Sequence, residues 1–391
     1  MTKTLSNKRL ALRAIAVGTV ALCGALAAGG ALAQSTIKIA NIVELSGGGA
    51  TAGTNFKNGV ELAVKEINAA GGILGKKIEV THSDTQSNPG VAKGLAQKAV
   101  DDNVFAVFGP GFSGSILVSM SETKRAEIPN FTGGEAASVT QQGNPYIFRT
   151  SFGQATSMPK VARYIAQNLK AKTVAVIFVN NDFGKGGRDS VTKALDTFGA
   201  KVVADISTDA GQVDFSSPVL KAKQSNADVV FVYTNEEESA RALRELRKQG
   251  VSKPIVGETV LTSQKVIELA GDAANGAVAH VGLTTDAPIP NMRAFRTKFE
   301  KAYNYIPDHN GIKGYTSVYV MKAGLEKAGK VDRAAFTKAM HGLQVSAAKE
   351  PGVIMDVSFD DKGDLDRESF MTEVKDGKQV VKETLPALGK K

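Results

Sequence analysis

The chain has 391 residues, of which 48 are Lys or Arg and 39 are Asp or Glu, and its formal net charge is +9. This length is sufficient for about two domains of ordinary size. Basic residues alternate with apolar ones instead of forming a stripe, as in RALRELRK at 241–248, so we expect no nucleic-acid partner.

Residues 1–33 indicate a secretory signal peptide. An uncharged apolar stretch runs from Ala14 to the small-residue motif Ala31-Leu32-Ala33, and it follows four basic residues, Lys3, Lys8, Arg9 and Arg13. We expect cleavage after Ala33 and a soluble periplasmic protein, because no other segment is long and apolar enough to span a membrane. The only cysteine, Cys23, lies in this segment, so we expect no disulfide in the mature protein.

From Ile37 the chain alternates short β-branched runs with segments of helical periodicity. The runs of the first alternation, which ends near Phe131, are IKIANIV, KIEVTH, VFAVF and IPNF. After a hydrophilic passage at about 141–153, a second alternation from about Thr173 to Val281 contains TVAVIFV, KVVADI, DVVFVY, PIVG and AVAHV. This pattern is typical of parallel sheets covered by helices on both faces. We therefore expect an α/β protein with two similar lobes.

The pattern changes after Val281. Three helices are expected, at Pro290–Tyr303, Gly311–Ala328 and Asp332–His341, and a β-rich tail of VIMDVSF and SFMTEVKDGKQVV ends the chain. The acidic sequence DDKGD at 360–364 lacks the Gly and Glu positions of an EF-hand loop. We expect a turn between strands there instead of a calcium site.

A glycine-rich loop, GPGFSG at 109–114, follows the third apolar run and has the G-x-G-x-x-G spacing of dinucleotide-binding turns. A nicotinamide site normally opens the first βα unit, however, and Pro110 removes a backbone donor. A nucleotide-dependent enzyme is therefore a distant alternative. The free N–H groups of such a turn, together with Ser113 and Ser115, suit a small anion. Alternatively, Ser113 caps its own helix.

The remaining residues give little support for catalytic or metal chemistry. No G-x-S-x-G motif is present, and metal-ligand spacing is absent among the four histidines, His82, His280, His309 and His341. We therefore expect no catalytic residue, no metal, no cofactor and no enzymatic activity.

Four segments of the chain form a distinctive set: NGVELAVKEINAAGGILGKKIEV from Asn58, DTQSNPGVAKGLAQKAV from Asp84, NNDFGKGG from Asn180 and VKDGKQV from Val374. Together they resemble the periplasmic branched-chain amino-acid binding proteins of ABC importers, which are leucine-binding type I solute-binding proteins. The resemblance covers essentially the whole mature chain. It implies two doubly wound lobes with parallel central sheets, joined by a three-strand hinge. Lobe I would comprise residues 35–150 and 283–344, and lobe II residues 151–282 and 345–391.

The resemblance also implies a ligand site. In family members that bind amino acids, the loops matching 109–115 and 132–136 hold the ligand carboxylate with hydroxyls and backbone N–H groups. Ser113 matches the first hydroxyl, and Gly134, Glu135 and Ala136 lie in the second loop, where Glu135 or Ala136 replaces a hydroxyl residue. Because two carboxylates repel, Glu135 must turn away or bind a cationic part of the ligand.

Three residues of lobe II complete the site that the resemblance implies. Phe183 replaces a tyrosine that bonds the ligand ammonium, and Asn235 replaces another aromatic residue. Glu258 lies at or one residue from the family's acidic ammonium partner, or it is a solvent-facing loop residue.

These replacements favour a small carboxylate with an apolar body. We expect a branched-chain or other aliphatic amino acid, with an aromatic or oxo carboxylic acid as the alternative. The implied partners are ABC importer permease subunits in the inner membrane, and presentation of the ligand to a sensor is a further alternative. We expect a monomer.

Overall fold

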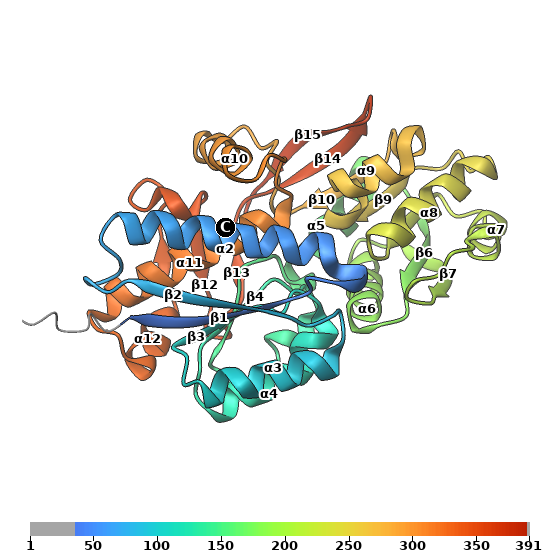
Figure 1. Cartoon of the computed structure of the whole chain (residues 1–391). Coiled ribbons are helices and arrows are strands. Elements are labelled where there is room, and N and C mark those ends of the chain that lie inside the picture. Colours follow the sequence, from blue (N-terminus) through green and yellow to red (C-terminus); the bar gives the residue numbers. More distant parts are fainter. Residues whose placement is uncertain (1–35, 389–391) are drawn as a thin grey trace, which may run out of the picture. The chain divides into compact units, whose positions relative to one another are not determined.

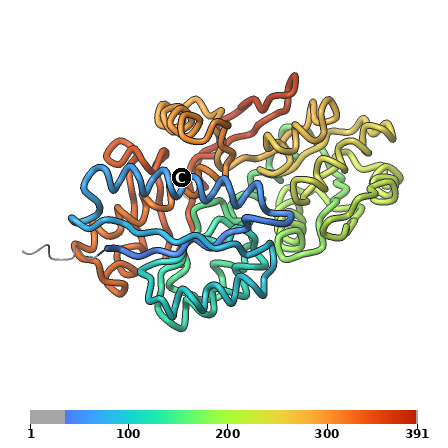
Figure 2. Tube along the Cα trace, viewed as in Figure 1, coloured from blue at the N-terminus to red at the C-terminus, as the bar shows by residue number. Residues whose placement is uncertain are grey.

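The computed structural model describes residues 36–388. The predicted signal peptide at 1–33 lies outside these residues. From Ile37 onward the chain forms one compact unit, which Figure 2 traces from blue to red. Among the described residues, no helix combines the length and apolarity that a membrane span requires.

The first sheet consists of five parallel strands in the order β2-β1-β3-β4-β5. Its strands are β1 Ile37–Val43, β2 Ile78–Asp84, β3 Ala106–Phe108, β4 Asn130–Thr132 and β5 Ile147–Arg149. The first four confirm the predicted runs. The hydrophilic passage that we predicted contains β5, which the sequence pattern misses because it is short and ends in a fully buried arginine, Arg149.

Helices cover both faces of the first sheet, which explains the continuous apolar runs of its strands. The crossover helices are α2 Ala50–Ala69, α3 Pro89–Asp101 and α4 Ser113–Arg125. Alternate residues of β1 enter different cores: Ile39 packs in the core that contains residues of α2, whereas Ile42 packs in the core that contains residues of α3. Figure 1 shows α2 on one side of β1, and α3 and α4 on the other.

The second sheet has seven strands in the order β15-β14-β10-β9-β8-β6-β7. Five are parallel and match the predicted runs: β6 Thr173–Val179, β7 Lys201–Thr208, β8 Val229–Tyr233, β9 Ile255–Glu258 and β10 Val278–Val281. The tail adds two antiparallel strands, β14 Ser369–Lys375 and β15 Lys378–Leu385. The helices are α5 Gln154–Arg163, α6 Asp182–Thr197, α7 Ser216–Gln224, α8 Glu236–Lys248 and α9 Gln264–Ala270.

The three predicted C-terminal helices are confirmed as α10 Pro290–Tyr303, α11 His309–Ala328 and α12 Arg333–Met340. They return to the core of the first sheet, where their residues pack with those of α2. A small sheet follows, formed by β11 Gln344–Val345, β12 Val357–Phe359 and β13 Leu365–Asp366. The DDKGD sequence at 360–364 connects β12 to the antiparallel β13, as predicted for a turn.

The chain passes between the two large sheets three times, after β5, after β10 and before β14. These passages agree with the predicted three-strand connection and with an α/β fold built on parallel central sheets. In the tail, Phe359 packs against Phe148 of the first sheet with ring centroids 6.3 Å apart, whereas β14 pairs with β10 of the second. The exact lobe boundaries stay a prediction.

Helices α2 and α11 are far apart in sequence and lie side by side. Their backbones approach closely through glycines: a Cβ atom at Gly314 would lie 2.1 Å from the carbonyl oxygen of Phe56, and one at Gly59 would lie 2.1 Å from that of Gly311. Any larger residue at these positions must push the helices apart. The position of Lys313, which lies beside Gly314 on α11, therefore depends on this contact.

We expect Gly314→Ala to lower the free energy of unfolding by roughly 1–3 kcal/mol, because overpacking separates α2 from α11. Gly94→Ala is the matched control, since Gly94 is exposed within α3 and a Cβ there would meet nothing within 4 Å. The control is expected to gain about 0.5–1 kcal/mol from its higher helix propensity. Urea unfolding followed by circular dichroism measures both, and equal stability of the two variants would contradict the close-contact interpretation.

Candidate functional site

A cleft of about 400 Å³ lies where loops from both large sheets meet. Its walls come from segments that follow strands β1, β3 and β4 of the first sheet and β6, β7 and β8 of the second. In open parallel sheets this edge, beyond the carboxyl ends of the strands, is the usual position of a ligand site. Apolar side chains contribute part of the wall, among them Phe56, Phe112 and Phe183.

The glycine-rich loop after β3 binds a carboxylate of the chain itself. The backbone N–H groups of Gly111 and Phe112 donate to the two oxygens of Glu44 at 3.0 and 3.1 Å. Glu44 directly follows β1 and is only 1% exposed. Burial raises the pKa of Glu44, although the hydrogen bonds from Phe112 and Gly111 oppose this shift. The sequence analysis expected these N–H groups to suit a small anion, and in the structure the carboxylate of Glu44 accepts from two of them.

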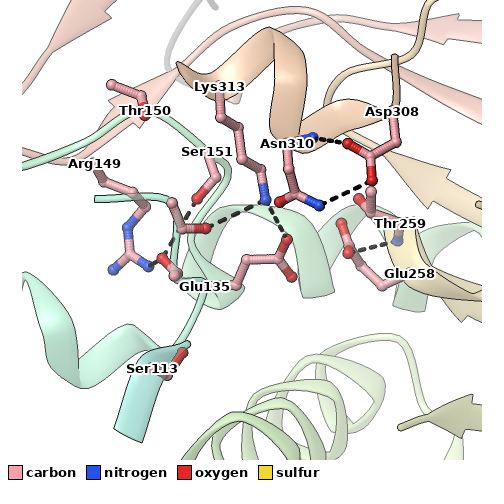
Figure 3. A network of polar contacts seen from close by, with 12 residues as sticks. Ser113, Glu135, Arg149, Thr150, Ser151, Glu258, Thr259, Asp308, Asn310 and Lys313 are labelled. Carbon is pink, nitrogen blue, oxygen red and sulfur yellow. Dashed lines mark hydrogen bonds and ion pairs between the residues drawn. The ribbon is translucent and has the colours of Figure 1, made fainter. Parts of the chain in front are cut away.

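Ser113 is the first residue of α4, and its hydroxyl does not cap that helix. The alternative interpretation of Ser113 as a cap is therefore wrong. Its Oγ instead accepts a hydrogen bond from the N–H of Ala136 at 3.2 Å, which connects the two loops of the first sheet. The buried Arg149, which Figure 3 labels, donates to the carbonyl oxygens of Gly134 and Ala136 in the second loop.

Glu135 forms a buried ion pair with Lys313 of α11, with Nζ and Oε1 3.3 Å apart (Figure 3). The hydroxyl of Tyr233 donates to its other oxygen at 3.3 Å. The pKa of Glu135 is raised to about 7, first by burial and then by the negative charge of Glu258, against the opposing charge of Lys313. The sequence analysis expected Glu135 to turn away or to bind a cationic part of the ligand, whereas in the structure its cationic partner is Lys313 of the protein itself.

Glu258 ends β9 and is fully buried, so the solvent-facing alternative is wrong. Its carboxylate accepts from the N–H of Thr259 and lies 3.0 Å from Nδ1 of His280. Burial raises the pKa of Glu258 and lowers that of His280 to about 3. The contact is therefore a hydrogen bond to a neutral imidazole. Glu258 is not among the residues that line the cleft in the described part of the chain.

The side chains of Phe183 and Asn235 both line the cleft. The ring of Phe183 stacks on Tyr233, with centroids 4.2 Å apart and an interplanar angle of 25°. Gln154 of α5 donates to the hydroxyl of Tyr233 at 3.0 Å and to the carbonyl oxygen of Phe183 at 2.8 Å. Asn235 precedes α8 and donates to Glu238 at 3.3 Å.

The structure thus brings five of the seven predicted residues to the cleft and leaves two outside it. Ala136 and Glu258 do not line it, whereas the other five do: Ser113, Gly134, Glu135, Phe183 and Asn235. Their role in ligand binding stays a prediction. The sequence analysis missed other polar residues of the wall, namely Glu44, Asp182, Glu236, His309 and Asn310. Two of them carry a usable signal, because Glu44 and Glu236 closely follow strands that were predicted correctly.

No group of three or more His, Cys, Asp or Glu side chains within residues 36–388 is arranged to hold a metal ion.

Residues 36–379 match the family described as periplasmic binding protein. The Leu/Ile/Val-binding protein BraC3 of Rhizobium johnstonii is 29% identical over 342 residues, which cover 87% of this chain and 91% of that protein. The branched-chain amino acid transporter substrate binding protein of Streptococcus pneumoniae, solved with isoleucine, is 26% identical with a TM-score of 0.79, covering 90% of this chain and 99% of that one. A solute binding protein of R. palustris, solved with benzoate, shares the fold at 21% identity with a TM-score of 0.82, covering 90% and 98%.

The buried Glu135 is expected to make stability depend on pH. Burial raises the pKa of Glu135 from its usual value of 4.5 to about 7 in the folded protein. Between these values the folded state binds more protons than the unfolded state, so the free energy of unfolding falls as pH rises from about 4.5 to about 7. Glu135→Gln removes this titration and is expected to make the fall shallower, by up to about 1.4 kcal/mol per pH unit. Urea unfolding at about pH 5 and about pH 7 measures the difference, and an identical fall in both proteins would rule out this role of Glu135.

Proposed function

Because this chain belongs to the periplasmic binding protein family, whose members are ABC-transporter-type substrate-binding proteins rather than enzymes, we propose that it captures a small organic ligand in the cleft and delivers it to the permease of an ABC importer. The observation that carries this proposal is the cleft itself, which receives residues from the carboxyl ends of strands in both sheets. We further propose that capture takes place in the periplasm, after removal of residues 1–33.

Three connections between the sheets suit a hinge motion. A ligand that contacts both walls of the cleft favours the closed conformation, because only there are both sets of contacts made. Gln154 lies just after one of these connections, where its Oε1 accepts from the N–H of Ala137 at 3.3 Å and its Nε2 donates to Tyr233 and Phe183 beside the second sheet. This arrangement supports closure around the ligand as the basis of delivery.

An aliphatic, branched-chain amino acid is the leading candidate ligand. The relatives named Leu/Ile/Val-binding proteins support it, as do the apolar side chains of Phe56, Phe112 and Phe183 in the cleft wall. An aromatic or oxo carboxylic acid is the second candidate. This candidate is favoured by the apolar ring of Phe183, at a position where the resemblance implies a tyrosine. The structurally similar solute binding protein of R. palustris that was solved with benzoate also favours it.

Isothermal titration calorimetry of the mature protein with leucine, isoleucine, valine and benzoate tests the proposal. We expect at least one of these ligands to bind with a Kd of about 1 μM or tighter, which corresponds to about −8 kcal/mol. Phe183→Ala is expected to weaken that binding roughly 10- to 100-fold, because it removes an apolar wall.

Phe198→Ala is the matched control. Phe198 follows the opposite end of α6 and packs, like Phe183, against the core of the second sheet, but it does not line the cleft. It is expected to keep the affinity of the unaltered protein. Equal losses of affinity in the two variants, or no heat with any candidate, count against the proposed site.

A further inference from the structure

The residues that line the cleft include acidic side chains but no basic ones. No Lys or Arg lines the cleft within the described residues, whereas six carboxylates do: Glu44, Glu135, Asp182, Glu236, Glu237 and Glu238. Acidic groups that converge on a concave surface produce a negative potential, which attracts cations and repels anions. A ligand whose only charge is a carboxylate is therefore opposed by the wall.

Most of these carboxylates are compensated by partners within the protein. Glu44 accepts from two backbone N–H groups, and Glu135 pairs with Lys313. Glu237 pairs with Arg241 at 2.8 Å, and Glu238 accepts from the N–H of Gly211 at 2.7 Å.

Glu236 differs from these four. It is the first residue of α8, and its Oε1 is buried without a hydrogen-bond partner. Burial raises its pKa to about 8, and the charges of Asp308 and Glu237 act in the same direction while Lys265 and Lys313 oppose them. A buried carboxylate oxygen without a partner is costly, and a cation in the cleft is able to remove that cost.

Asp308 supplies the negative charge that contributes most, after burial, to the raised pKa of Glu236. It caps α11, where its Oδ1 accepts from the N–H groups of Asn310 and Gly311 at 2.7 and 3.2 Å. Its neighbours His309 and Asn310 line the cleft. Asp308 itself is not among the lining residues in the described part of the chain.

We propose that the cleft recognises a small aliphatic ammonium compound whose charged nitrogen binds the carboxylate of Glu236. This inference rests on the proposed function and narrows its ligand class. No wall residue supplies a cation for a ligand carboxylate, and the two amides of the glycine-rich loop already bind Glu44. The ammonium is required for recognition, and a carboxylate on the ligand is not.

Glu236 takes the role that the family resemblance assigns to Glu258. Glu258 is removed from the cleft wall and is bonded to Thr259 and His280. Glu236 lies in the wall, and one of its oxygens has no partner. His309 and Asn310 of α11 line the same cleft, so a ligand bound to Glu236 that also contacts them favours the closed conformation.

Calorimetry with three ligands of the same carbon skeleton tests the inference: leucine, leucinamide and 4-methyl-2-oxopentanoate. Leucinamide has the ammonium without the carboxylate, and the oxo acid has the carboxylate without the ammonium. We expect leucinamide to bind at least as tightly as leucine, and the oxo acid to bind roughly 100-fold more weakly or not at all.

Glu236→Gln keeps the shape of the side chain and removes its charge. We expect it to weaken leucinamide binding roughly tenfold or more. Glu245→Gln is the matched control, because Glu245 lies on the same helix, pairs with Lys248 and does not line the cleft. This control is expected to keep the affinity within about threefold. Circular dichroism of both variants verifies that they fold.

The outcomes separate this inference from the proposed function. Tighter binding of the oxo acid or of benzoate than of leucinamide overturns the inference and leaves the proposed function intact. Equal effects of Glu236→Gln and Glu245→Gln on leucinamide binding also overturn it. If leucine, leucinamide, the oxo acid and benzoate all fail to bind, both the inference and the proposed function are contradicted.

Discussion

The hydrogen bonds from Gly111 and Phe112 to the carboxylate of Glu44 determine much of the chemistry of this cleft. A turn of glycines at the start of a helix presents unpaired N–H groups and the positive end of the helix dipole, and these groups attract an anion. Here the anion is part of the protein. The buried carboxylate of Glu44 is held in place by these two hydrogen bonds. The same two N–H groups are then no longer available to a ligand carboxylate. The ligand chemistry therefore depends on the acidic groups that remain without partners.

Behind the wall, other buried charges are compensated in the same manner. Lys313 reaches Glu135 from α11, and Arg149 holds the carbonyl oxygens of the loop that carries Glu135. In a region of low dielectric constant such contacts favour one arrangement of the loops, because a displaced group loses its partner and cannot regain water. A preorganised wall of this type suits a protein that must bind and release a ligand by closing and opening two rigid halves.

The sequence pattern predicted the layers of the fold because both faces of each parallel sheet are covered, which produces unmistakable apolar runs such as TVAVIFV. It missed β5, where only three residues pair and one of them is Arg149. The loops of the site were also predictable, since they follow strands at one edge of the sheets. The partners of their side chains were not. Glu44 is 67 residues from Gly111, and Glu135 is 178 residues from Lys313. Neither pairing has a local signal in the sequence, and both change the charge that a ligand meets.

A crystal structure of the protein with bound leucinamide tests the central claim most directly. We expect the ammonium nitrogen to lie about 2.7–3.2 Å from a carboxylate oxygen of Glu236, with Glu44 still accepting from Gly111 and Phe112. A ligand oxygen bound to those two N–H groups, with Glu44 displaced and Glu236 far from the nitrogen, would contradict it.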